Sequence, residues 1–106
     1  MRFEEIVEKT REKARTITPD SGSFLAVEVH TTGEGEGVFY VEAKDGRINV
    51  EPYEYNDKSC AVTMKGEDFI KLLDGKLDAV LAFTTGKLKV DGDVGKALEF
   101  SKLLKK

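Results

Sequence analysis

The chain has 106 residues, of which 40% are hydrophobic and 35% charged, and its formal net charge is −3. This length is typical of one domain with a single core, here residues 1–106, and the interspersed charges argue against a nucleic-acid-binding protein. Cys60 is the only cysteine, so the chain cannot form an internal disulfide and a cytoplasmic location is expected. The charged N-terminus does not resemble a signal peptide, and no apolar run is long enough for a membrane span.

The N-terminal region predicts one amphipathic helix. Apolar and small residues recur at helical spacing, while charged residues fill the opposite side. The positions on the apolar side are Phe3, Ile6, Val7, Thr10, Ala14 and Ile17. The segment 18–23 contains Pro, Gly, Asp and two Ser residues, and it should end the helix in a loop.

Three strands are expected next, because apolar residues alternate with more polar ones in three short runs. Such alternation buries one face of a sheet and leaves the other more polar. The apolar positions are Leu25, Val27 and Val29, then Phe39, Val41 and Ala43, then Ile48 and Val50. The pair Asp45-Gly46 predicts a tight hairpin between the second and third strands. The glycine-rich run 33–37 predicts a looser hairpin loop.

The second half of the chain predicts a strand, two short helices, a fifth strand and a final helix. Gly75 should end the first of these helices, Asp78 lies near the start of the second, and Asp93 can cap the last one. The inward positions are Cys60, Val62 and Met64; Phe69, Ile70, Leu72 and Leu73; Leu77, Val80, Leu81 and Phe83; Leu88 and Val90; and Val94, Ala97, Leu98, Ser101 and Leu104. Without repeats or a linker, these elements form one α+β domain.

Residues that could carry catalysis or hold a metal are sparse. His30 shares a strand face with Glu28, and two ligands make a poor metal site. Cys60 alternates with apolar residues, so it is expected to be buried. The run 33–37 leads into a strand rather than into a helix N-terminus, so it does not fit a phosphate loop. We expect no enzyme, metal or cofactor, and an enzyme that uses His30 or Cys60 is the least favoured alternative.

Two acidic pairs have structural explanations. Asp91 and Asp93 flank a glycine, but the remaining ligands of a calcium loop do not follow. Glu67 and Asp68 lie at the start of a helix, where carboxylates interact favourably with the helix dipole. Neither pair requires a catalytic role.

The last helix carries more apolar residues than one flat core can bury. Leu103 lies about 180° and Phe100 about 120° from Val94 around the helix axis. This side either frays and leaves a small exposed patch, or it contacts a ligand, a partner subunit or a membrane.

The ordered motifs of the second half resemble the sterol carrier protein type 2 domain family. In that family a strand with Thr-Met is followed by Asp-Phe, Leu, Gly-Lys, Ala-Phe and Gly-Lys-Leu-Lys, then by a glycine turn and a helix that opens with Gly-x-Ala. The matching residues are Thr63-Met64, Asp68-Phe69, Leu72, Gly75-Lys76-Leu77, Ala82-Phe83, Gly86-Lys87-Leu88-Lys89-Val90 and Gly92-Asp93-Val94-Gly95-Lys96-Ala97. The earlier strands match by pattern only.

The resemblance implies an α+β fold in which helices cover one face of a five-stranded mixed sheet, with an apolar tunnel between sheet and helices. It also implies non-enzymatic binding or carrying of a fatty acid, fatty acyl-CoA, phospholipid or sterol-like ligand. The positions expected at the tunnel are Phe39, Val41, Ile48, Val50, Met64, Phe69, Leu73, Leu77, Leu81, Phe83, Leu98 and Phe100. Several relatives have glutamine where this chain has Thr85, and many continue beyond the position of Lys106. The pocket is therefore expected to be more open, or to be covered by a second subunit.

The expected mechanism is solvation of a lipid chain, in which each buried methylene contributes about 0.8 kcal/mol. An empty void of roughly 200 Å³ would cost about 5 kcal/mol of stability, so the ligand-free protein should be partly collapsed or should purify with lipid. The alternative is a dimerising or docking module for a lipid-metabolising enzyme, with a vestigial tunnel. The expected partner is a lipid or acyl-chain molecule and no nucleic acid. A transient membrane-surface contact and a homodimer stay open, as does the identity of the lipid.

Overall fold

The computed structural model describes residues 2–20, 22 and 24–104; Ser21 and Ser23 of the expected loop lie outside them. The elements in these residues are α1 (Phe3–Ala14), β1 (Leu25–Thr32), β2 (Gly37–Lys44), β3 (Arg47–Glu51), β4 (Cys60–Lys65), α2 (Gly66–Leu73), α3 (Ala79–Thr84), β5 (Lys89–Gly92) and α4 (Val94–Leu104). Their order is the one that the sequence predicts.

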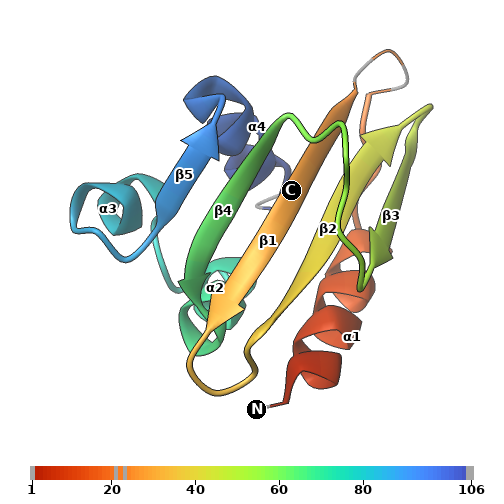
Figure 1. The fold of residues 1–106 in the computed structure, drawn as a ribbon. Helices are drawn as coiled ribbons and strands as arrows, with labels where there is room; N and C mark the ends of the chain where they lie inside the picture. Colours follow the sequence, from red (N-terminus) through yellow and green to blue (C-terminus); the bar gives the residue numbers. More distant parts are fainter. Residues whose placement is uncertain (1, 21, 23, 105–106) are drawn as a thin grey trace.

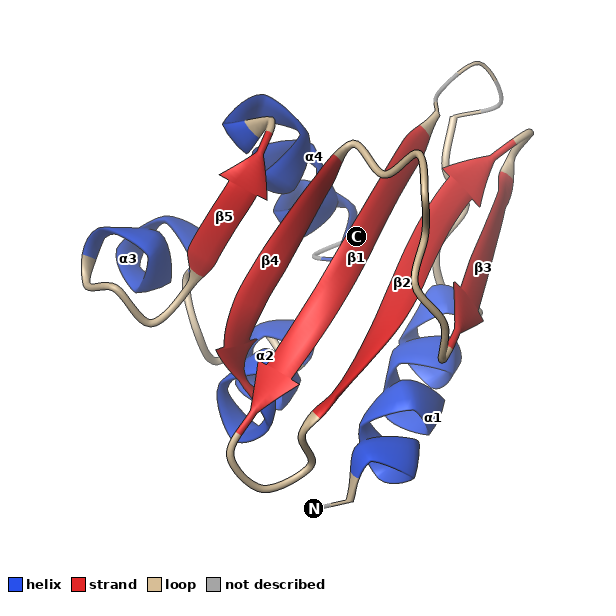
Figure 2. Cartoon of the chain, viewed as in Figure 1, coloured by secondary structure: helices blue, strands red, loops and turns tan. Residues whose placement is uncertain are grey.

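The strands form one sheet in the order β3-β2-β1-β4-β5 (Figure 2). The central β1–β4 pair is parallel, and the other three pairs are antiparallel. A tight turn joins β2 to β3 as expected, and Asp45 and Gly46 have φ values of 54° and 76°. These positive angles fit the hairpin turn that Asp-Gly favours. The expected α+β fold with a five-stranded mixed sheet is thus confirmed.

Helices α1, α2 and α4 lie on one face of the sheet, and α3 lies beyond the β5 edge (Figure 1). Helix α1 packs against β3 and α2, and α4 packs against β4 and β1. Three phenylalanines fill the core under α1 and α2. Phe39 has edge-to-face contacts with Phe3 and Phe69, at ring-centroid distances of 6.0 and 5.6 Å, in the range that aromatic pairs prefer.

Two local expectations are wrong. Helix α1 ends at Ala14, and Ile17 is buried in the segment after it rather than on the helix. The face of β1 opposite the helices is not simply polar, because Ala26 and Glu28 are also buried there. The connection from β3 to β4 crosses this face (Figure 1), and the backbone N–H of Tyr55 donates to Glu28 at 3.1 Å.

Helix α4 is rotated relative to the expectation. Phe100 and Leu103, expected away from the core, are buried, whereas Val94 and Leu98, expected within the core stripe, are exposed. Ala97, Ser101 and Leu104, which the stripe also included, are buried as expected. The uncovered apolar side of α4 is therefore the side that faces α3.

Candidate functional site

An apolar groove lies between α3, β5 and α4. Two helix caps and a glycine turn fix the elements that border this groove. The Asp78 carboxylate accepts hydrogen bonds from the backbone N–H groups of Val80 and Leu81 at 2.8 and 3.4 Å and so caps α3. Asp93 accepts from the backbone N–H of Lys96 at 3.2 Å at the start of α4, as expected. Gly86 turns the chain from α3 toward β5 with a φ of +82°, a value that favours glycine.

The groove has a cavity volume of about 160 Å³ and a lining that is almost entirely apolar. Its lining residues are Ala79, Val80, Phe83, Leu88, Val90, Val94, Ala97, Leu98 and Ser101. The only hydroxyl among them belongs to Ser101, and it donates to the backbone carbonyl of Leu98 at 2.8 Å. The groove therefore offers dispersion contacts and almost no unpaired polar group to a ligand.

Large apolar side chains are exposed along this groove. Val80 and Leu81 are 59% exposed, and Phe83, Val94 and Leu98 are 45%, 44% and 39% exposed. Four of these five side chains line the groove, and Leu81 lies beside it on α3. This concentration of exposed apolar side chains makes the groove the candidate site of the structure.

The residues expected at the tunnel fall into two groups. Phe39, Val41, Val50, Met64, Phe69, Leu73 and Phe100 are buried, and Ile48 and Leu77 are partly buried against them. Phe83 and Leu98 line the groove, and Leu81 is exposed beside it. The inward orientation expected of these last three residues is wrong, because the six-residue α3 does not cover the edge. The structure does not show the expected tunnel, and contact of these residues with a ligand stays a prediction.

The sequence reasoning missed that Val80, Leu88, Val90 and Val94 border a groove, because it placed all four in the core. The signal for a groove was present as the surplus of apolar residues on the last helix. That surplus predicts an apolar surface without predicting which side of the helix remains uncovered.

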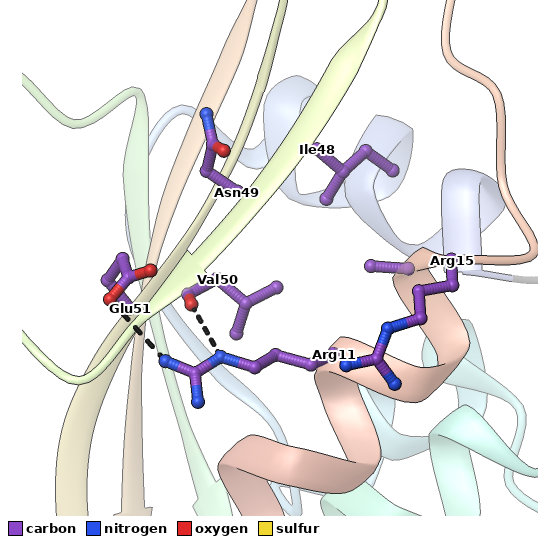
Figure 3. Close-up of a pocket in the computed structure, with 7 residues that line it drawn as sticks. Arg11, Arg15, Ile48, Asn49, Val50 and Glu51 are labelled. Carbon is purple, nitrogen blue, oxygen red and sulfur yellow. Dashed lines mark hydrogen bonds and ion pairs between the residues drawn. The ribbon is translucent and has the colours of Figure 1, made fainter.

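A second hollow, of about 260 Å³, lies between α1 and β3 and is polar (Figure 3). Arg11 donates to the backbone carbonyl of Val50 at 3.0 Å and pairs with Glu51 at 3.4 Å. Arg15, at its rim, pairs with Glu8 at 3.6 Å. Because both guanidinium groups already have acidic partners, this hollow is explained by the docking of α1 on the sheet.

The carboxylate of Glu28 is the centre of a polar network on the opposite face of the sheet. It accepts hydrogen bonds from the His30 ring at 2.5 Å and from the backbone N–H of Tyr55, and Lys58 lies 3.7 Å away. Burial raises the pKa of Glu28, but these hydrogen bonds and the Lys58 charge outweigh burial and hold the pKa below its usual value. The Tyr55 hydroxyl donates to Glu42, and this bond, with burial, raises the pKa of Tyr55 to about 12.

This network holds the β3–β4 connection on the sheet, which is a structural role. Cys60, the other candidate nucleophile, is buried, and burial together with Asp93 raises the pKa of its thiol, which disfavours the reactive thiolate. Within the described part of the chain, no three His, Cys, Asp or Glu side chains are grouped to hold a metal ion. None of the described helices is long and apolar enough to cross a bilayer.

Comparison with protein families shows that residues 3–105 match the model of the SCP-2 sterol transfer family. Human sterol carrier protein 2 is 32% identical over 102 residues, which cover 95% of this chain and 19% of that protein. Hydroxysteroid dehydrogenase-like protein 2 from Xenopus tropicalis is 34% identical over 113 residues, which cover 91% of this chain and 27% of that protein. The chain therefore spans a small part of the length of these curated relatives.

Solved structures support the same fold. The solution structure of a palmitated sterol-carrier-like protein from Aedes aegypti superposes with a TM-score of 0.73 at 18% identity and covers 98% of this chain and 95% of that one. The ligand-free sterol carrier protein 2 from Yarrowia lipolytica gives a TM-score of 0.60 at 23% identity, covering 95% and 74%. At these identities the likeness establishes the fold.

Proposed function

We propose that this chain, which belongs to the SCP-2 sterol transfer family, binds the hydrocarbon part of a lipid in the groove between α3, β5 and α4. One observation carries the proposal: large apolar side chains stay exposed around a hollow whose lining is almost free of polar groups. A soluble domain gains no stability from leaving such a surface uncovered, whereas a hydrocarbon ligand would remove it from water.

The volume of the groove limits how many carbon atoms of a ligand it can hold. An apolar cavity of about 150 Å³ accepts a benzene-sized molecule, so the 160 Å³ groove suits a segment of about six carbon atoms. Six buried methylenes would contribute about 5 kcal/mol before the cost of ordering the ligand. A longer chain would need further space, which movement of α4 away from Met64 on β4 and Leu73 on α2 would supply.

The proposed ligands are fatty acids, fatty acyl-CoA, phospholipids or sterol-like molecules, bound without catalysis. The name of the human relative and the palmitate on the mosquito protein favour a lipid of this kind. The buried, unpaired Cys60 is compatible with a reducing cytoplasm as the setting.

Displacement of a fluorescent fatty acid from the purified, delipidated protein tests the proposal. Phe83→Ser should weaken binding about tenfold, because a lost aromatic contact of 1.4 kcal/mol corresponds to that factor. Phe24→Ser is the matched control, since Phe24 is 44% exposed, nearly the same as Phe83, and does not line the groove. Equal affinities of the two variants would contradict the groove as the site. Failure of the unmodified protein to bind fatty acid, acyl-CoA, phospholipid or sterol would contradict the function.

A second candidate function is a dimerising or docking module. Val80 and Leu81 favour it, because they share the highest exposure among the apolar side chains of α3 and Leu81 does not line the groove. A dimer through α3 should elute earlier from a gel-filtration column at higher protein concentration, and Leu81→Asp should abolish that shift. A concentration-independent monomer would contradict dimerisation.

A further inference from the structure

A polar hollow of about 330 Å³ lies on the other side of the β5 edge from the apolar groove. It is formed where β1 and β4 end, α2 begins and the turn after α3 leads toward β5. Three lysines line it, namely Lys65, Lys87 and Lys89. We call it the lysine hollow. Thr32 and Thr63 add hydroxyl groups to its lining.

The three lysines are available to a ligand. None of their side chains has an ion pair or a hydrogen bond to another residue in the described part of the chain. Lys65 also borders a neighbouring hollow that contains Glu34 and Glu67, whereas Lys87 and Lys89 line the lysine hollow alone. Lysine ammonium groups are common donors to phosphate.

Asp68 is a second polar group that a ligand in this hollow would meet. Its side chain lines the lysine hollow, the residue is only 9% exposed, and no described residue hydrogen-bonds to or pairs with its carboxylate. Among the described residues, no fully buried side-chain oxygen lacks a hydrogen-bond partner, so the carboxylate oxygens of Asp68 face the open hollow. A hydroxyl group on a ligand would donate a hydrogen bond to Asp68 in place of water, while the lysines hold a neighbouring anion.

The three lysines and Asp68 together favour a phosphate ester as the ligand. Three ammonium groups and two hydroxyls fit the several oxygens of a phosphate better than the two of a carboxylate. The surrounding sequence favours an anion as well, because residues 76–106 contain seven basic and four acidic residues, whereas residues 1–75 contain ten basic and sixteen acidic ones.

The lysine hollow and the apolar groove share one segment of chain. Phe83, Leu88 and Val90 line the groove, while Lys87 and Lys89 line the lysine hollow from the positions between them. We propose that the lysine hollow binds the phosphate group of a hydroxyl-bearing phosphate ester, with the acyl chain of the same lipid in the groove. The part that concerns the lipid rests on the proposed function; the phosphate site does not.

Two lipids that differ only in phosphate test the inference on the intact protein. Oleoyl-lysophosphatidic acid and monoolein share one acyl chain and a glycerol, and both are titrated below their micelle concentrations. We expect lysophosphatidic acid to bind about tenfold more tightly, the factor that 1.4 kcal/mol produces. The double variant K87A/K89A should remove this advantage and leave monoolein binding unchanged. K44A/K71A, which removes two exposed lysines outside both sites, is the charge-matched control.

Equal binding of the two lipids to the unmodified protein, or an equal loss in K44A/K71A, would overturn the inference and leave the lipid function standing. If neither lipid binds, the proposed function fails. A titration of the protein with glycerol 3-phosphate, which has no acyl chain, then tests the phosphate site by itself. In that titration, amide chemical-shift changes confined to Thr32 and to residues 63–68 and 85–89, and abolished by K87A/K89A, would sustain a site for free phosphate esters. The absence of such changes would overturn it.

Discussion

The two ends of the sheet bury their apolar residues differently. At the β3–β2 end, the 12-residue α1 covers the sheet, and Phe3, Phe39 and Phe69 fill the space beneath it. At the β5 end, the 6-residue α3 covers little, and Phe83 and Leu98 remain exposed along the groove.

The closed end of the sheet therefore serves mainly the stability of the domain, and the open end leaves apolar surface available for binding. Apolar surface that leaves water on folding stabilises the domain by about 25 cal/mol per Å², so the closed end contributes most to the hydrophobic free energy of folding. The exposed surface at the open end contributes nothing to folding until something covers it. Substitutions should therefore affect unfolding at the closed end and binding at the open end.

Phe39→Ala should have the largest effect on stability. The side chain is fully buried between two aromatic rings, and truncation of such a residue costs about 3–5 kcal/mol. Urea unfolding followed by circular dichroism measures the loss, and Phe39→Leu provides a milder variant if the alanine protein does not fold. Phe83→Ala at the open end should cost only about 1 kcal/mol, because Phe83 is 45% exposed and loses only part of the burial free energy of a Phe side chain; equal losses at the two positions would contradict the comparison.

Gly37→Ala should destabilise the closed end by about 1–3 kcal/mol, because it overfills a packed site. A Cβ atom at Gly37 would lie 2.3 Å from a ring carbon of Phe3, so the ring must move and disturb its contact with Phe39. Gly22→Ala is the control, since a Cβ atom there meets nothing within 4 Å. The same urea titration compares the two variants, and a similar loss in both would exclude a packing effect.

Glu28→Gln should cost about 1 kcal/mol at neutral pH, the usual worth of a hydrogen bond. Because the pKa of Glu28 is lowered in the folded protein, its contribution is fully present above the unfolded value of 4.5 and is lost as the pH falls through the folded pKa. Stability of the unmodified protein should thus decline more steeply below pH 4.5 than that of the variant. Parallel pH profiles of the melting temperature would contradict this role; Glu12→Gln, at an exposed position, is the control.

Leu81→Ser should have the smallest effect, about 0.5 kcal/mol, because the side chain is already 59% exposed. Leu72→Ser, at a buried position on α2, should by contrast destabilise strongly. Thermal unfolding measures both, and a marked loss at Leu81 would show that the open end is covered in solution.

Features that depend on neighbouring residues were predicted well. The Asp45-Gly46 hairpin, the cap at Asp93 and the end of α2 before Gly75 follow from backbone preferences that act within a few residues. The family also followed from sequence, because its motifs keep their spacing along the chain. The end of α1 was placed too late, because Ile17 continues the helical apolar spacing although it is buried outside the helix.

The candidate site was predicted only in part. The family resemblance places Phe83 and Leu98 inside a tunnel, whereas in the structure both line an open groove. In the sequence, Asp68 is accounted for by its position at a helix start, and only the tertiary structure brings it to the same hollow as Lys87 and Lys89.

The sequence by itself determined the order of the elements, their turns and caps and the family, because these depend on local chemistry and on spacing along the chain. Only the tertiary structure decided which side of α4 is buried and which residues meet across the β5 edge. A helix with apolar residues around much of its circumference can dock in more than one rotation, and packing against β1 and β4 selects the one that buries Phe100 and exposes Leu98. The apolar groove results from that selection.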